Sequence, residues 1–99
     1  MEYKNKKAIK LDLTGCKYLG EVHERIREAF GFPEWYGQNW SAFSDLLWSE
    51  CDADKIEITG EHTISEKFNE HIKIMHKILQ REKLHRAKYG EKFEYEIID

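Results

Sequence analysis

The segments of this sequence that alternate apolar and polar side chains in the manner of β-strands never follow one another directly. Alternation predicts strands at residues 8–13, 55–59 and 92–98, with longer segments between them. Connections of that length cross over through helices, join parallel strands and are right-handed. We therefore expect an α/β fold in which a three-stranded parallel sheet is packed by helices. Because 99 residues allow one modest core, residues 1–99 are expected to form a single small domain.

The first connection contains two predicted helices. Apolar residues recur at helical spacing over 19–30, and Gly31 followed by Pro33 marks the end of that helix. After a loop, Asn39 is a favourable N-cap for the second helix. Steps of three and four residues divide the second helix into two faces. The expected buried stripe is Trp40, Phe43, Leu46 and Leu47, and the other side carries Ser41, Ser44, Asp45 and Trp48.

The second connection is helical over most of its length. The pattern Thr63-x-x-Glu66 resembles a capping box and is expected to open a helical stretch over 64–89, which Gly90 ends. A single helix of that length is long for so small a domain, so we expect a break near Asn69. The predicted apolar stripe is Phe68, Ile72, Met75 and Leu79.

One part of the chain has no basic residue. The net charge is −3, from 16 Lys and Arg against 19 Asp and Glu, yet no Lys, Arg or His lies between Arg27 and Lys55. This basic-free window contains all three tryptophans. An acidic, aromatic segment repels nucleic acid and attracts a basic partner, whereas the alternative is a core element with exposed acids at its edges. The six acids of the window are Glu28, Glu34, Asp45, Glu50, Asp52 and Asp54.

Composition also bears on the location of the protein. No run of about 18 apolar residues occurs, and charges occupy the N-terminal residues where a signal peptide needs an apolar run. We therefore expect a cytoplasmic protein without a membrane span. Cys16 and Cys51 are far apart and lack a C-x-x-C spacing, so reduced, partly buried thiols are expected and neither a disulfide nor a zinc site is indicated.

No pattern of residues predicts catalysis. His71 and His76 are five residues apart, and His76 and His85 are nine apart, so neither pair has the spacing of a zinc-binding helix. A Gly-rich phosphate loop and a nucleophile motif are also missing. We expect no enzyme, no metal and no cofactor, although hydrolysis involving the histidine-bearing helix is the enzyme-class alternative. Exposed helix positions are expected for the histidines, which are His23, His62, His71, His76 and His85.

Residues 33–47 carry the most specific pattern. They read Pro-Glu-Trp-Tyr-Gly-Gln-Asn-Trp-Ser-Ala-Phe-Ser-Asp-Leu-Leu. This segment resembles the recognition segment of the barstar family, small bacterial proteins that inhibit secreted ribonucleases such as barnase inside the cell that makes them. The family string Pro-Glu-aromatic-Tyr-Gly-x-Asn-x-x-Ala-hydrophobic-x-Asp is filled at each fixed position. The order of the predicted elements is also similar, which extends the resemblance over essentially the whole chain.

The resemblance implies a role for Asp45. It corresponds to the family's key acid, a carboxylate that enters the ribonuclease active site where an RNA phosphate would sit and meets Arg and Lys groups there. From the residues alone, an exposed helix acid is the alternative. Trp35 is either an interface anchor or a side chain buried on the domain's own edge. Around them, Gly37 is expected to have a positive φ, and Tyr36 to anchor the loop to the core.

The chain departs from the family pattern on the same helix. Ser41 occupies the place of a second acid, Ser44 replaces a bulky aromatic, and Trp48 would add contact area beside Asp45. On the C-terminal helix, Gln80 and Glu82 both lie in range of a further family acid. The expected partner-binding residues are Trp35, Asn39, Ser41, Ser44, Asp45 and Trp48.

The resulting hypothesis is an intracellular protein inhibitor of a ribonuclease or related toxin. The free chain is expected to be a monomer that contacts a protein, without direct nucleic-acid or membrane contacts. The alternative is a barstar-fold binding module or immunity protein for a non-ribonuclease partner.

Overall fold

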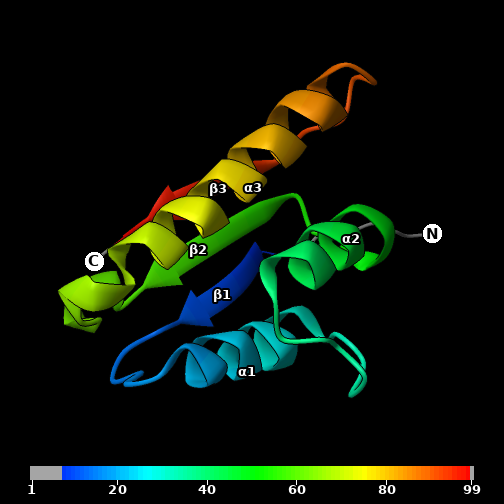
Figure 1. Ribbon diagram of the computed structural model, residues 1–99. Coiled ribbons are helices and arrows are strands. Elements are labelled where there is room, and N and C mark those ends of the chain that lie inside the picture. The colour runs from blue at the N-terminus through cyan, green and yellow to red at the C-terminus, as the bar shows by residue number, and fades with distance from the viewer. Residues whose placement is uncertain (1–7, 99) are drawn as a thin grey trace.

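The computed structural model of the chain describes residues 8–98 (Figure 1). Its strands β1 (Ala8–Asp12), β2 (Lys55–Thr59) and β3 (Glu94–Ile97) form one sheet in the order β1-β2-β3, and both pairings are parallel. The predicted α/β fold with a three-stranded parallel sheet is confirmed. The first strand ends one residue earlier than predicted, and the third is shorter at both ends. Residues 1–7 and 99 of the expected domain lie outside the described residues.

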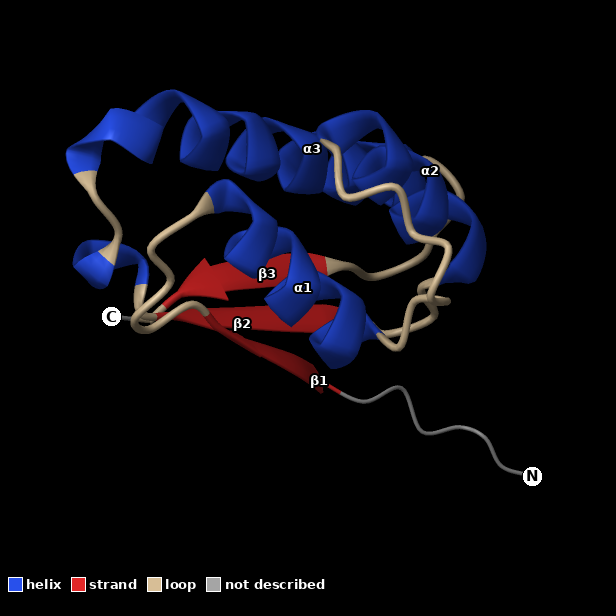
Figure 2. Cartoon of the chain, turned by 60° about the horizontal axis from the view of Figure 1, so that its bottom comes forward, coloured by secondary structure: helices blue, strands red, loops and turns tan. Residues whose placement is uncertain are grey.

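The three long helices cover one face of the sheet (Figure 2). Helices α1 (Leu19–Phe30) and α2 (Trp40–Glu50) connect β1 to β2, and α3 (Asn69–Ala87) connects β2 to β3. Successive right-handed crossovers that advance in one direction across a sheet place their helices on the same side. Within residues 8–98, no helix has both the length and the apolar character that crossing a membrane requires.

The opposite face of the sheet carries charged side chains. The ladder aligns Lys10 with Glu57, and Glu57 with Glu96. Lys55 Nζ lies 3.3 Å from Glu96 Oε1 and 3.6 Å from Glu57 Oε2. Parallel sheets are usually covered on both faces, and their strands then lack a clear alternation. Within residues 8–98, no helix covers the second face of this sheet, so each strand alternates and could be recognised from the sequence.

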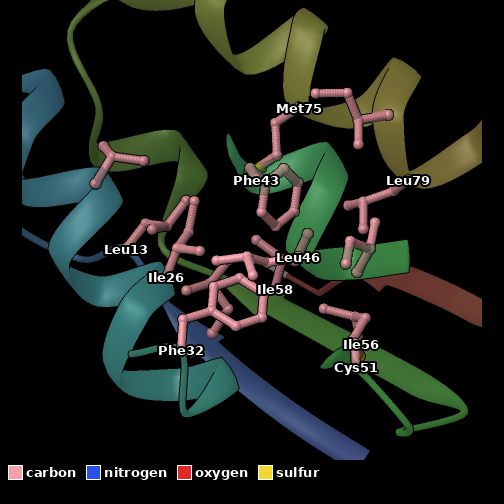
Figure 3. Close-up of a cluster of buried hydrophobic side chains, with 14 of the residues drawn as sticks. Leu13, Ile26, Phe32, Phe43, Leu46, Cys51, Ile56, Ile58, Met75 and Leu79 are labelled. Carbon is pink, nitrogen blue, oxygen red and sulfur yellow. The ribbon is translucent and has the colours of Figure 1, made fainter. Parts of the chain in front are cut away.

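Apolar side chains from the covered face of the sheet and from all three helices form one core (Figure 3). Ile26 of α1, Phe43 of α2 and Met75 of α3 belong to the same buried cluster as Ile56 and Ile58 of β2. Full burial of such side chains contributes about 1.5–3 kcal/mol each. This cluster fixes α2 between α1 and α3.

The start of α3 differs from the predicted capping box. Thr63 Oγ1 donates to the Gly60 carbonyl at 2.7 Å and accepts from the Gly15 amide at 3.1 Å, so Thr63 closes the turn after β2. Short 3-10 turns, η1 (Glu61–Thr63) and η2 (Glu66–Phe68), precede α3. The predicted break near Asn69 is confirmed, but of the expected helical residues 64–68 only Glu66–Phe68 are helical, as a 3-10 turn. The Thr63 hydroxyl is engaged with Gly60 and Gly15, so it does not cap the helical stretch that follows.

Gly60 is confined by the turn that follows β1. Its φ is 83°, and an added Cβ would overlap the backbone nitrogen of Thr14 and lie 2.7 Å from its Cα. Gly90 has a similar φ of 73°, but an added Cβ there would meet nothing within 4 Å. The two glycines therefore separate the effect of backbone conformation from the effect of close packing.

Replacing Gly60 with Ala is expected to lower the free energy of unfolding by about 3 kcal/mol, since strain at positive φ and steric overlap add together. Gly90→Ala, which introduces only the strain, should lower it by about 1 kcal/mol. Urea unfolding of both variants measures the difference. Equal losses of unfolding free energy in the two variants would show that Thr14 moves away from the added Cβ at no cost.

Candidate functional site

The loop between α1 and α2 is anchored by two buried aromatic side chains. Gly31 ends α1 with a φ of 71°, and the Phe32 amide donates to the Arg27 carbonyl at 3.0 Å. Phe32 and Tyr36 are buried, whereas Trp35 between them is 74% exposed. The predicted anchoring by Tyr36 is confirmed. Of the two alternatives for Trp35, burial on the domain's own edge is wrong.

The turn into α2 differs from the prediction at Gly37. The positive φ, 51°, belongs to Gln38 rather than Gly37. An added Cβ at Gly37 would lie 3.1 Å from Asn39 Nδ2, a tight contact with the capping side chain, and 3.5 Å from Ala42 Cβ, an ordinary contact. Asn39 caps α2 as predicted: its Oδ1 accepts from the Ala42 amide at 2.8 Å, and its Nδ2 donates to the Gly37 carbonyl at 3.0 Å. The Asn39 side chain is thus already occupied within the chain.

The outward side of α2 and one side of α3 form a groove with a volume of about 410 Å³. An adjoining hollow of about 260 Å³ continues it toward the end of α2. The walls of the groove combine hydroxyls, charges and apolar surface. Its lining is Trp40, Ser41, Ser44 and Asp45 from α2, and Ile74, Lys77, Ile78 and Arg81 from α3.

Four of the six expected partner-binding residues lie along this groove and hollow. Ser41, Ser44 and Asp45 line the groove, and Trp48, which is 64% exposed, lines the hollow. The predicted division of α2 into faces is confirmed for Phe43, Leu46 and Leu47, which are buried on the other side. It is wrong for Trp40, which is half-buried and lines the groove, because its indole reaches across to His71 of α3. Trp35 and Asn39 line neither space and stand apart on the loop and at the cap.

Asp45 presents an exposed carboxylate beside cationic neighbours. No ion pair within the described range 8–98 includes Asp45. Arg81, which lines the same groove, donates from Nη2 to Ser44 Oγ at 3.2 Å. A charged group held on a helix without an internal partner can accept charge-assisted hydrogen bonds from another molecule.

The α3 wall contains residues that we did not single out from the sequence as partner-binding. Lys77, Arg81 and His85 follow one another at intervals of four, so they share one side of α3. This four-residue spacing is the sequence signal from which a shared cationic side of α3 could have been recognised. Of the two α3 residues in range of a further family acid, Gln80 accepts from the Tyr95 hydroxyl through its Oε1 at 2.9 Å and lines neither space. Glu82 lines the adjoining hollow, where it is buried and hydrogen-bonded to Arg86.

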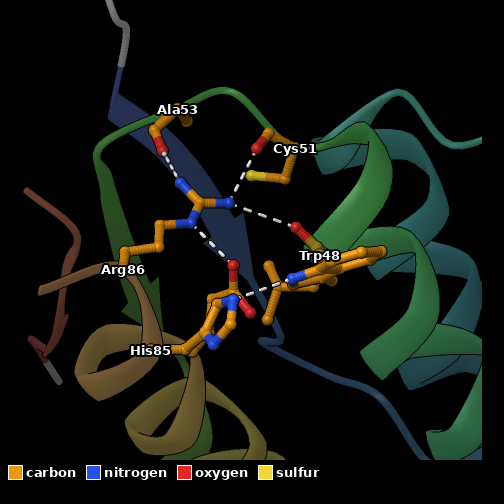
Figure 4. Close-up of polar contacts among 7 residues, drawn as sticks. Trp48, Cys51, Ala53, His85 and Arg86 are labelled. Atoms are coloured by element: carbon orange, nitrogen blue, oxygen red, sulfur yellow. Dashed lines mark hydrogen bonds and ion pairs between the residues drawn. The ribbon is translucent and has the colours of Figure 1, made fainter. Parts of the chain in front are cut away.

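Two tryptophans hold α2 to α3 through histidines. Trp40 Nε1 donates to His71 Nδ1 at 3.2 Å, near the start of α2. Trp48 Nε1 donates to His85 Nε2 at 3.0 Å, near its end (Figure 4). Both bonds require an unprotonated acceptor nitrogen, and hence a neutral imidazole. The expectation of exposed helix positions is wrong for His71, His76 and His85, which are half-buried.

His23 is the most buried of the histidines. It is 1% exposed, its Nδ1 is hydrogen-bonded to the Tyr36 hydroxyl at 2.7 Å, and its ring centroid lies 4.3 Å from that of Trp40. Burial first, and the nearby His71 second, lower the pKa of His23 from 6.5 to about 4. His23 was also expected to be exposed, but its contacts join α1 to both the loop and α2.

Arg86 fastens the other end of α2 (Figure 4). Its Nη2 donates to the Cys51 carbonyl at 2.7 Å and to the Leu47 carbonyl at 3.2 Å, and its Nη1 donates to the Ala53 carbonyl at 3.1 Å. Its Nε pairs with Glu82 Oε2 at 2.6 Å. The guanidinium thus satisfies carbonyls that a helix end leaves without partners. Arg86 was not recognised from the sequence as a structural residue.

The remaining polar clusters do not form a metal site. Among residues 8–98, no three His, Cys, Asp or Glu side chains are grouped so that they could hold a metal ion. His76 Nε2 lies 2.7 Å from Glu61 Oε2 as a pair. Cys16 and Cys51 are buried and free, as expected of reduced thiols.

Comparison with known proteins gives one family. A family model described as Barstar (barnase inhibitor) matches residues 6–98, which is nearly the whole chain. No curated protein matches the sequence.

The low pKa of His23 predicts acid sensitivity. Below about pH 6.5 the unfolded chain takes up a proton that the native chain accepts only near pH 4, so stability falls as pH falls through this window. Between about pH 7.5 and about pH 5, His23 is expected to remove about 2 kcal/mol from the free energy of unfolding. Urea unfolding of wild type and His23→Gln at both pH values measures how much of the lost stability is due to His23. An equal pH dependence in the variant would assign the loss to other histidines.

The buried contacts of Arg86 predict a large effect of its truncation. Arg86→Met leaves the Glu82 carboxylate buried and unpaired, so the free energy of unfolding should fall by about 3–5 kcal/mol. Arg81→Met, on the exposed side of the same helix, should change it by less than about 0.5 kcal/mol. Equilibrium unfolding of both variants provides the comparison, and similar stabilities would contradict the role assigned to Arg86.

Proposed function

The chain belongs to the barstar family, and from that premise we propose that it is an intracellular protein inhibitor of a ribonuclease. It would block the nuclease active site with the segment that runs from Glu34 to Trp48. The proposal includes a cytoplasmic location, because two buried free thiols fit a reducing compartment. The proposal requires no cofactor and takes the free chain as a monomer.

The observation that carries the proposal is the unpaired carboxylate of Asp45. It lies on the outward side of α2, which the core, the Asn39 cap and the Arg86 contacts hold in place. In a nuclease active site, groups that bind RNA phosphate would instead bind this carboxylate through charge-assisted hydrogen bonds. Substrate would then be excluded by occupancy, and no bond need be made or broken.

The other expected contact residues would contribute to binding in different ways. Trp48 adds exposed aromatic area at the hollow, and Trp35 offers a large side chain on the preceding loop. Ser41 and Ser44 contribute hydroxyls along the groove. Asn39 acts through the cap that it forms, and so contributes by shaping the segment.

A second function is supported by the α3 wall. Lys77 and Arg81 stand beside Asp45, so the groove is not uniformly acidic. An immunity protein or binding module for a non-ribonuclease partner would retain the same groove. Catalysis is not proposed, because barstar-family members are inhibitors and four of the histidines bond to other side chains.

Truncation of Asp45 tests the proposed site. Asp45→Ala is expected to weaken inhibition by about 2–5 kcal/mol, because it leaves cationic groups of the nuclease unpaired. Ser41→Ala, one turn away, should weaken it by about 1 kcal/mol. The measurement is inhibition of RNA hydrolysis by those small secreted bacterial ribonucleases, barnase included, that the wild-type chain inhibits.

The matched control is Glu28→Ala, which removes another exposed acid of the basic-free window at a position on α1 that lines neither the groove nor the hollow. Its effect should remain below about 0.5 kcal/mol. Thermal unfolding of each variant shows whether folding is retained. If folded Asp45→Ala inhibits as strongly as wild type, the assigned site is wrong. If no ribonuclease is inhibited, the non-ribonuclease alternative is favoured.

A further inference from the structure

The α3 wall of the groove carries two cationic side chains. Lys77 and Arg81 are exposed, lie about one helical turn apart and line the same groove as Asp45. Within the described part of the chain, no ion pair includes either residue. By contrast, Arg27 pairs with Glu24 at 2.7 Å on α1.

Arg81 reaches across the groove to a neutral group. Its Nη2 donates to Ser44 Oγ at 3.2 Å. A guanidinium has five N–H donors in a planar fork that matches a carboxylate, and the ammonium of Lys77 adds three more donors. The bond to Ser44 uses one of these donors and fixes the direction of the Arg81 side chain along the groove.

Apolar side chains lie beneath these charges. Trp40 is half-buried, Ile78 is buried and Ile74 is 38% exposed, and all three line the groove. A partner side chain that enters would displace water from both apolar and charged groups. Charge pairs are less screened where water is excluded, so charges of the two molecules that meet there must be opposite in sign.

We propose that Lys77 and Arg81 form a cationic subsite beside Asp45, which receives a carboxylate of the protein partner. The inference rests on the proposed function and specifies the chemistry of its target. The partner presents a cation to Asp45 and, next to it, an Asp or Glu side chain to Lys77 and Arg81. An active site that presents cations alone places like charges against α3, which weakens binding.

A nucleic-acid phosphate fits this subsite less well than a carboxylate side chain. Asp45 lines the same groove, and Glu82 lines the adjoining hollow. An RNA strand carries a charge at every nucleotide, so its neighbouring phosphates would face these acids. A single carboxylate on a folded partner can contact Lys77 and Arg81 without that repulsion.

The test uses barnase as the probe, because the matched family is described as its inhibitor. Cations that bind phosphate should be repelled by the α3 wall, so Lys77→Glu combined with Arg81→Glu is expected to inhibit barnase on the order of tenfold more strongly than wild type. The control is Lys83→Glu combined with Lys92→Glu, which makes the same change in net charge at exposed positions outside the groove. Its gain should be less than about threefold. Thermal unfolding checks that both variants fold.

The outcomes separate the subsite from the proposed function. No gain for the groove variant, a loss of inhibition, or an equal gain for the control overturns the cationic subsite. Adding Asp45→Ala to the groove variant should abolish the gain. A gain that survives Asp45→Ala supports the subsite but contradicts the proposed role of Asp45. A single-stranded RNA oligonucleotide serves as a second probe: if wild type binds it and the groove variant does not, Lys77 and Arg81 contact nucleic acid and the proposal is wrong.

Discussion

The arrangement of this chain depends on one buried guanidinium. Arg86, on α3, binds the carbonyls of Leu47, Cys51 and Ala53, which belong to the end of α2 and the turn that follows it. The guanidinium carbon of Arg86 (Cζ) also lies 4.6 Å from the ring centroid of Phe93, the residue just before β3. A buried ion pair adds little net stability over apolar residues of the same size, but its geometry is specific. Arg86 therefore holds the end of α2, the turn before β2 and the residue before β3 in one relative position.

The opposite end of α2 is fixed by different chemistry. Asn39 caps the first turn, and Trp40 lies against His23 of α1 while it donates to His71 of α3. With both ends held, the outward face of α2 is presented in a single orientation. Preorganisation of this kind reduces the entropy lost on association. Such a face suits a protein that acts by occupying a partner's active site, because geometry must be maintained without any covalent step.

The two serines on α2 connect the family assignment to the charge pattern of the groove. Where other barstar-family members are expected to carry an acid and a bulky aromatic, this chain has Ser41 and Ser44. The small side chain at Ser44 leaves room for Arg81 to reach it from α3. The neutral serine at position 41 also leaves Asp45 as the carboxylate among the residues that line the groove. The groove of this chain therefore has both signs of charge side by side.

Local patterns in the sequence determined the three strands, the buried side of α2 apart from Trp40, the Asn39 cap and the family motif at residues 33–47, because each depends on residues close together in the chain. Tertiary structure decided which distant residues meet. Periodicity shows that Lys77 and Arg81 share a side of α3, but only the packing of α3 against α2 places that side next to Asp45. The same limit applies to Thr63, whose capping pattern yielded to bonds with Gly60 and Gly15. A sequence pattern indicates which face of an element is buried, whereas the partner across that face is chosen by how the elements pack.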